Sequence, residues 1–252
     1  MDKLKIKTEA EIQIMAHCGH LLAGVRNKLA KAVVPGISCI EIEELACKLI
    51  DETGGKASFK MVPGYKHATC LSVNDVVVHG IPNEYVIKNG DVVGIDVGLY
   101  LDGFHTDTST TVAAGEATSD IQLFLETGRR AMDKSIKAVK IGRKISDISM
   151  AMQEIVEKSG FSTIKALTGH GVGRELHEEP AIPCFVPDGG YQSPIIREGM
   201  VLAIEVMYNQ GTSEVVYKNN DGWTIVTADG KISGLFEHTV AVLKSGPVIL
   251  TE

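Results

Sequence analysis

Residues 91–113 read DVVGIDVGLYLDGFHTDTSTTVA, and this stretch decides the fold. Its two runs, Asp91–Tyr100 and Phe104–Ala113, are rich in β-branched residues and flank the turn sequence Leu101-Asp102-Gly103. An Asp-Gly pair between two such runs favours a tight hairpin turn. We therefore predict an antiparallel hairpin whose first strand carries Asp96 near its centre.

Helices are predicted on both sides of this hairpin. Thr8 with Glu11, and Ser38 with Glu41, have the spacing of a capping box, in which two side chains cap the backbone at a helix start. The first of these helices ends at Pro35-Gly36. Apolar periodicity predicts further helices over residues 119–139 and 146–159, and strands over residues 68–79, 164–173, 200–208, 223–227 and 236–243.

The order helix, helix, strands thus occurs twice along the chain. At an offset of 106 residues Gly36 matches Gly142, and four further pairs match similarly. Helix pairs also share such spacing by chance, so both duplication and coincidence stay open. We expect a single α+β domain over residues 1–252, with halves at about 8–113 and 119–243. Its helices should cover a mainly antiparallel sheet.

Composition argues against several classes of protein. The net charge is −7 and the pI about 5.6, whereas a nucleic-acid-binding protein normally has a basic stripe. Apolar runs are short, and the N-terminus lacks the apolar segment of a secretory signal, so no membrane partner is expected. The five cysteines show no CxxC spacing, which is typical of free thiols in a reducing compartment such as the cytoplasm.

Acidic residues inside apolar strands are the most informative feature. Asp96, Glu205 and Glu237 lie in the stretches VGIDVG, LAIEVM and LFEHTV. Asp107 lies on the hairpin strand that folds back beside Asp96. A buried carboxylate without a partner is costly. Each acid alone could point outward from a half-exposed strand, but four of them in one small domain indicate a metal site.

Histidines supply the second signal. His170 is framed by glycines in GHGVG, and glycine lets a backbone and a ligand approach closely, so a ligand role is favoured. His177 follows before acids and a proline. His79 lies at a strand end, where by itself it reads as a structural histidine. His17 and His20 lie three residues apart on the first helix and are interpreted as a solvated helix face.

One imidazole and four carboxylates form a hard, oxygen-rich ligand set, which suits Mn, Fe(II), Co or Mg. Four negative charges balance two divalent cations, and five side chains exceed the four ligands of a structural zinc site. Two ions roughly 3.5–4 Å apart can activate a water and stabilise a tetrahedral intermediate. The residues by themselves therefore indicate a dinuclear metallohydrolase.

Over essentially its whole length the chain resembles the type I, bacterial-type methionine aminopeptidases. The motifs that carry the resemblance are HGIP at 79–82, IDV at 95–97, DT at 107–108, GHG at 169–171, HEEP at 177–180, IE at 204–205 and EHT at 237–239. The resemblance implies the pita-bread fold, a pseudo-twofold repeat of helix-helix-strand units. It also implies a metal-dependent methionyl aminopeptidase that removes N-terminal methionine from peptides and nascent proteins.

The resemblance assigns the five ligand residues. Asp96 would chelate one ion, and Asp107 and Glu237 would bridge two. His170 and Glu205 would complete the second ion, and Glu205 would also take part in proton transfer. A hydroxide bridging the two metals would attack the scissile carbonyl. The metals implied are Co, Mn or Fe(II), with Zn and Mg as alternatives.

Further residues would contact the substrate. By the same resemblance, His177 would steady the carbonyl and the tetrahedral intermediate, and His79 would contact the scissile amide nitrogen. The side-chain pocket would be formed by Phe59, Tyr65, Cys70, Leu176 and Trp223, with Val62 nearby. Tyr65 and Trp223 could equally be core aromatics.

Other implications of the resemblance concern ions and partners. Carbonyls around Asn74, Val76 and Ser233 resemble the family's monovalent-cation site. The substrates implied are peptides and nascent polypeptide N-termini, met at the ribosome, and the chain is expected to be a monomer.

The chain departs from the family at four places. Val206 stands where proline is usual, and Leu235 where glutamine is common. Cys184-Phe185 and the segment Phe59–Val62 also differ from the usual residues. No ligand is affected, so we expect consequences for pocket shape and rate. This predicts a second, weaker or differently selective methionine aminopeptidase of its organism.

Three rival interpretations remain. A proline-directed enzyme, an Xaa-Pro aminopeptidase or prolidase, normally has an additional N-terminal domain, whereas about sixty residues precede the first site segment here. A type II methionine aminopeptidase would have a long insertion between His177 and Glu205, where 27 residues lie. A non-catalytic binding protein on the same fold would have lost ligand residues, and all five are present.

Overall fold

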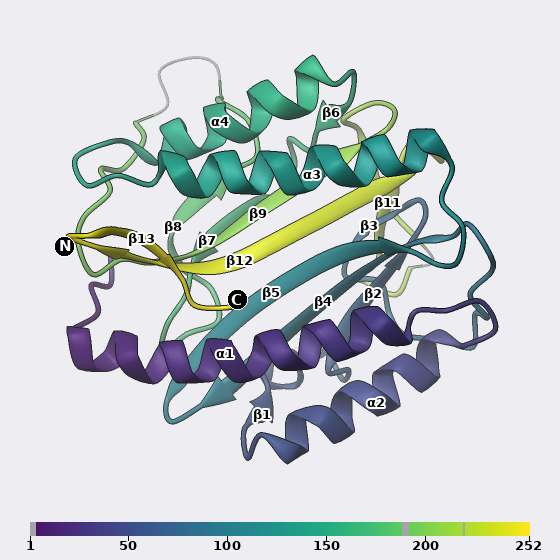
Figure 1. The fold of residues 1–252 in the computed structure, drawn as a ribbon, viewed down its shortest axis with the longest axis horizontal. Helices are drawn as coiled ribbons and strands as arrows, with labels where there is room; N and C mark the ends of the chain where they lie inside the picture. The colour runs from purple at the N-terminus through teal and green to yellow at the C-terminus, as the bar shows by residue number, and fades with distance from the viewer. Residues whose placement is uncertain (1–3, 188–191, 219) are drawn as a thin grey trace.

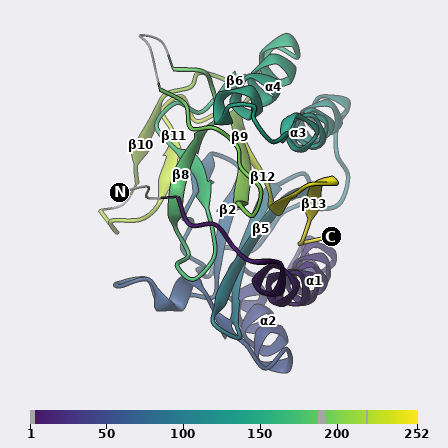
Figure 2. The same cartoon turned by 90° about the vertical axis from the view of Figure 1, so that its left-hand side faces the viewer.

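The computed structural model describes residues 4–187, 192–218 and 220–252; the first three residues of the N-terminal segment lie outside this range. Figure 1 shows the helices lying over one face of a long, twisted sheet. The helices are α1 (Glu9–Ala32), α2 (Cys39–Glu52), α3 (Ser119–Ala138) and α4 (Ile145–Lys158), with a short 3-10 helix η1 at Phe59–Met61. Figure 2, a view at right angles, confirms that the strands β10 and β11 lie on the opposite side from the helices.

The strands fall into two sheets. They are β1 (Lys56–Ala57), β2 (Thr69–Val73), β3 (Val76–Val78), β4 (Val92–Leu101), β5 (Phe104–Ala113), β6 (Ser162–Thr163), β7 (Thr168–Gly171), β8 (Glu178–Pro183), β9 (Val201–Asn209), β10 (Val215–Tyr217), β11 (Ile225–Thr227), β12 (Ser233–Leu243) and β13 (Gly246–Ile249). The large sheet has the order β1-β4-β5-β12-β9-β7-β8, with β2 beside β4, β6 beside β9 and β13 beside β12. The small sheet has the order β10-β11-β3. All strand pairs among the described residues are antiparallel.

Local sequence accounts for the helix starts and the hairpin. The Thr8–Glu11 and Ser38–Glu41 capping boxes both form, so these two helices begin where they were predicted. β4 and β5 pair along their whole length, down to Leu101 opposite Phe104. The two turn residues between them, Asp102 and Gly103, both have positive φ angles, as the mirror-image hairpin turn requires.

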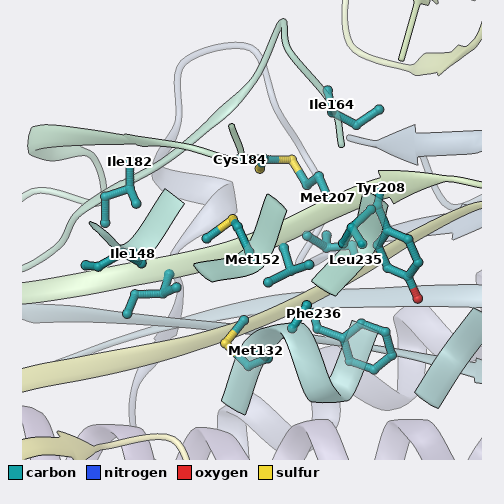
Figure 3. Packing of buried hydrophobic residues seen from close by; sticks show 14 of the residues in the cluster. Met132, Ile148, Met152, Ile164, Ile182, Cys184, Met207, Tyr208, Leu235 and Phe236 are labelled. Carbon is teal, nitrogen blue, oxygen red and sulfur yellow. The ribbon is translucent and has the colours of Figure 1, made fainter. Parts of the chain in front are cut away.

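Two main hydrophobic cores, together with a smaller cluster that includes Ile12 and Met15 of α1, hold the helices on the sheet. One lies under α1 and α2 and includes Leu22, Ile42 and Ile95, all fully buried. The other lies under α3 and α4 and includes Phe124 and Tyr208. Figure 3 shows side chains of this second core between the helices and the sheet.

Several predicted strands are shorter than expected. The predicted strand at 68–79 is divided into β2 and β3 by a turn at Asn74, whose φ is +54°. The predicted strand at 164–173 is reduced to β7. The short strands β1, β6, β8, β10 and β13 were not predicted, because edge strands of two to six residues carry little periodicity of their own.

Candidate metal centre

The strand register assembles a row of polar side chains across the large sheet. Cys70 on β2 lies opposite Asp96 on β4, and Asp96 lies opposite Ser109 on β5. Ser109 lies opposite Glu237 on β12, and Glu237 opposite Glu205 on β9. Residues directly opposite in neighbouring strands share one face of the sheet. Three acids that lie far apart in the sequence are therefore aligned on one face.

A second row lies two residues further along the same strands and therefore on the same face. Asp107 follows Ser109 in this row, and Thr239 follows Glu237. Thr239 lies opposite Ala203, and Ala203 lies opposite His170 on β7. Side by side, the two rows bring together the five residues expected to bind metal.

The glycines around His170 have a steric reason. A Cβ on Gly169 would lie 2.5 Å from the carbonyl oxygen of Ala203, and one on Gly171 would lie 2.4 Å from that of Glu179. No side chain fits at either distance. The GHG motif thus lets β7 pass close to β8 and β9 while it presents the one imidazole to the row of acids.

The acids are crowded and poorly solvated. Asp107 and Glu237 are almost fully buried, and burial is the main cause that raises the pKa of each. Burial likewise raises the pKa of Asp96 to about 7, and burial with the neighbouring Asp96 raises that of Glu205. Like charges at close range oppose ionisation, so this site disfavours its own four charges unless a cation is present.

His170 has the tautomer that a metal ligand needs. Its Nδ1 lies 2.8 Å from the carbonyl oxygen of Gly171. Because that oxygen can only accept, Nδ1 carries the proton and Nε2 keeps its lone pair. Nε2 faces the carboxylate of Glu205 at 3.6 Å. Burial lowers the pKa of His170 to about 3, so the ring stays neutral.

The residues present fit divalent cations. Asp107, His170 and Glu237 each offer a ligand atom, and these atoms lie within 4.8 Å of one another. Oδ1 of Asp96 and Oε1 of Glu237 are buried and have no hydrogen-bond partner within the described residues. Buried polar atoms are normally paired. The absence of a protein partner for these two oxygens in the described part of the chain indicates that they bind a cation.

A cavity of about 440 Å³ opens beside the cluster. All twelve residues predicted for metal and substrate line it: Phe59, Tyr65, Cys70, His79, Asp96, Asp107, His170, Leu176, His177, Glu205, Trp223 and Glu237. Val62, named as a neighbour of the pocket, lines it too. Sequence reasoning missed the lining residues Val78, Ala166–Thr168 and Met207.

The apolar end of the cavity is an aromatic cluster separate from the two main cores. Phe59, Tyr65, Cys70 and Leu176 are buried together, with Trp223 packed against them. The Tyr65 and Trp223 rings meet edge to face, with centroids 5.0 Å apart. These aromatics are thus a small core and a pocket wall at once.

Two histidines flank the cluster. His79 has a φ of +55°, a strained conformation for a non-glycine residue, and its ring lies 6.3 Å from that of Trp223. His177 is exposed and lines the cavity, and its ring meets that of His170 edge to face, with centroids 4.5 Å apart. The buried part of each ring lowers the pKa of both histidines, so neutral imidazoles face the cavity.

Most departures from the family pattern lie outside the cavity. Val206 lies opposite Phe236 and, as the neighbour of Glu205, points to the helix side of the sheet. Leu235 and Cys184 are buried among the side chains of the second core in Figure 3. Cys184 donates its thiol hydrogen to the carbonyl oxygen of Glu205 at 3.4 Å. Of the departures, only the segment at 59–62 reaches the pocket.

Of the three residues expected at a monovalent-cation site, Asn74 lies in the turn after β2, and Val76 and Ser233 begin β3 and β12. The backbone N–H of Ser233 donates to the carbonyl oxygen of Asn74 at 2.8 Å, and Val76 begins β3 two residues later. Cation binding here stays a prediction.

No helix among the described residues is long and apolar enough to cross a membrane. All five cysteines are free.

Comparison with known proteins gives consistent findings. The model of metallopeptidase family M24 matches residues 13–244. The methionine aminopeptidase of Aquifex aeolicus is 42% identical over 99% of both chains. Methionine aminopeptidase 1 of Bacillus subtilis is 41% identical over 97% of this chain and 98% of its own.

Solved structures agree with these relatives. The crystal structure of the Thermotoga maritima methionine aminopeptidase superposes with a TM-score of 0.94 at 40% identity, over 99% of both chains. The prolidase of Pyrococcus furiosus reaches a TM-score of 0.79 at 22% identity, over 98% of this chain and 65% of that one. The second likeness extends to the fold alone.

Proposed function

The chain belongs to metallopeptidase family M24, and from this premise we propose that it is a methionine aminopeptidase, which removes N-terminal methionine from peptides and nascent proteins. The observation that carries the proposal is the convergence of a cation-binding cluster and an apolar cavity in a chain 40–42% identical to methionine aminopeptidases. The fold is the pita-bread arrangement shared with those enzymes and with prolidases.

Divalent metal is used by this site, and we propose two ions per chain. Two ions match the charge of four carboxylates and leave no acid unpaired. Mn, Fe(II) and Co suit the oxygen-rich set best. The residues that would hold them are Asp96, Asp107, His170, Glu205 and Glu237. Bound divalent ions supply a water activated near neutral pH and an electrophile for the substrate carbonyl.

Protein groups around the cluster would move protons and orient the substrate. The Glu205 carboxylate lines the cavity beside the other acids, so it would be placed to take a proton from water and return it to the leaving amine. His177 is neutral and faces the cleft, so an N–H of its ring would donate to the oxygen that becomes negative in the tetrahedral intermediate. His79 would face the scissile amide nitrogen.

The cavity explains a preference for methionine. Its apolar end is walled by Phe59, Tyr65, Cys70 and Trp223. An unbranched thioether side chain packs well into irregular apolar space and against aromatic rings. Because the carboxylates line the cavity, the free amine of the first residue would lie among them, which would restrict cleavage to chain ends.

The setting of the reaction follows from the same proposal. We infer that the enzyme acts in the cytoplasm on nascent chains at the ribosome, as a monomer. Its free cysteines support a reducing compartment.

The test is hydrolysis of Met-Gly-Met-Met by chelator-stripped protein resupplied with Mn, Fe(II) or Co, alongside Ala-Gly and Xaa-Pro peptides. We expect metal-dependent release of methionine that is lost in Asp96→Asn. Asp102→Asn makes the same chemical change in the turn of the same hairpin, where the residue is exposed and has a positive φ that asparagine tolerates. This control variant should release methionine at the wild-type rate.

Other outcomes of this assay would change the assignment. Release only from Xaa-Pro peptides would move the chain to the proline-directed enzymes. Equal turnover of Met-, Ala- and Pro-starting peptides would contradict methionine selectivity. Absence of hydrolysis with every metal would favour a non-catalytic protein on this fold.

A further inference from the structure

Strands β5 and β12 carry Asp107 and Glu237 and meet at the middle of the large sheet, in a contact that we call the seam. The seam comprises residues 107–111 of β5 and 235–239 of β12. Within the described residues its backbone pairing covers only two register positions, Glu237 with Ser109 and His238 with Thr108. On either side of this short ladder the backbones do not pair directly.

Threonine hydroxyls close both ends of the seam in the same way. At one end, Thr111 Oγ1 donates to the carbonyl oxygen of Leu235 at 2.7 Å and accepts from its N–H at 2.9 Å. At the other end, Thr239 Oγ1 donates to the carbonyl oxygen of Asp107 at 2.8 Å and accepts from its N–H at 2.9 Å. Both threonines are fully buried.

The two ends differ in what the threonine holds. Thr111 is hydrogen-bonded to both backbone groups of Leu235, an apolar residue outside the cavity. Thr239 is hydrogen-bonded to both backbone groups of Asp107, whose carboxylate belongs to the cation cluster. One Asp107 oxygen already accepts from the N–H of Thr108 at 3.0 Å. The N–H and C=O of Asp107 are therefore both hydrogen-bonded, and so is one oxygen of its carboxylate. Only the other carboxylate oxygen is left to face the cation cluster.

Thr239 is itself held from behind. Its N–H donates to Thr251 Oγ1 at 3.1 Å, and Thr251 Oγ1 also lies 2.9 Å from Nδ1 of His238. The buried Arg26 guanidinium donates to the carbonyl oxygen of Thr251 at 3.1 Å and to Thr108 Oγ1 at 2.8 Å. These hydrogen bonds hold Thr239 in place, so its hydroxyl in turn fixes the position of the Asp107 backbone.

We propose that Thr239 is a positioning residue of the metal centre, whose hydroxyl fixes the Asp107 backbone and thereby the point at which the Asp107 carboxylate meets the cations. This inference rests on the proposed function only in that the cluster binds divalent metal. Groups that orient a ligand typically change metal affinity 10–100-fold when they are removed. Thr239 should therefore control metal affinity in a way that Thr111, its structural counterpart, does not.

The experiment compares Thr239→Val with Thr111→Val in chelator-stripped protein titrated calorimetrically with Mn²⁺. Each substitution keeps the side-chain shape and leaves one N–H and one C=O of the facing residue without their partner. Urea unfolding of the stripped proteins should therefore show similar losses of stability. Mn²⁺ affinity should fall roughly 10–100-fold in Thr239→Val, stay at the wild-type value in Thr111→Val, and be recovered in Thr239→Ser.

Two results would overturn the inference: wild-type Mn²⁺ affinity in Thr239→Val, or an equal loss in Thr111→Val. If Thr239→Val does not fold, Thr251→Val takes its place, because it removes the acceptor of the Thr239 N–H and leaves the seam bonds intact. Weaker Mn²⁺ binding in that variant supports the inference, and unchanged binding contradicts it. Wild-type protein that binds no Mn²⁺ would instead refute the proposed function, so the two failures are distinguishable.

Discussion

Removal of divalent cations should make the stability of this protein fall as the pH rises from about 4 to about 7. In the absence of cations, burial raises the pKa of Asp96, Asp107, Glu205 and Glu237 above their ordinary values. A carboxyl with a higher pKa in the folded chain binds its proton more tightly there than in the unfolded chain. The stability that it contributes is complete below the unfolded pKa and is lost as the pH rises through the folded pKa.

Asp96 sets the scale of this effect. The rise of its pKa from 3.8 to about 7 corresponds to a loss of roughly 4 kcal/mol across that interval. Because Asp96 is partly open to the cleft, solvent screening makes this value an upper bound. The other three carboxyls act in the same direction. Mn²⁺ at a hundred times its Kd should restore about 2.7 kcal/mol at neutral pH.

The assay is urea unfolding of EDTA-stripped protein, followed by far-UV circular dichroism between pH 5 and pH 7.5, with and without Mn²⁺. Asp96→Asn serves as the diagnostic variant, since an amide does not titrate. Its stripped form should depend less on pH, exceed stripped wild type in stability at pH 7, and gain less from Mn²⁺. A stripped wild-type protein equally stable at pH 5 and pH 7, or one that Mn²⁺ does not stabilise, would refute the reasoning.

Three further predictions concern single residues. His177→Ala should lower kcat for methionine release by roughly 10²–10³-fold with little change in Mn²⁺ affinity, because His177 is not one of the five residues proposed to hold the cations; parallel losses in kinetics and calorimetry would argue against its role. Glu43→Ala should reduce the free energy of unfolding by about 1–3 kcal/mol in urea melts, because the buried carboxylate accepts three hydrogen bonds at the start of β2. Glu43→Gln should reduce the free energy of unfolding by less. Gly128→Ala should cost about 1–3 kcal/mol, since its Cβ would lie 2.3 Å from the Phe236 ring, whereas Gly24→Ala in open space on α1 should be neutral or stabilising; equal melting temperatures for the two alanine variants would contradict the packing argument.

The parts of the fold that could be predicted from sequence are those set by local chemistry. The capping box at Thr8 and the Asp102-Gly103 turn act within a few residues, and both appear where they were expected. The pairing of β5 with β12 could not be predicted in this way, because it joins residues more than a hundred positions apart. The division into halves at 8–113 and 119–243 stays a prediction.

The candidate site was predictable to a similar degree. Acids within apolar strands indicate a cation site without any knowledge of the fold, because burying several charges without one is so costly. Which side chains share a face depends on strand register, which could not be predicted from the sequence; the ligand roles of the five residues come from the family resemblance and stay a prediction. The positioning role that we propose for Thr239 was not predicted, because hydroxyl and β-branched residues are common in any strand, so nothing in the sequence separates a positioning hydroxyl from an ordinary one.

The strand rows also have a consequence for the kinetics of unfolding. Asp96 and Glu237 lie 141 residues apart in sequence and become neighbours only through the pairing of β4, β5 and β12. Contacts of such long range form late, after the cost of loop closure has been met. Cations therefore have no complete site to bind in the folding transition state, and they should slow the unfolding limb of a chevron plot while leaving the folding limb unchanged. On this view the metal centre prolongs the lifetime of the native state without guiding the chain toward it.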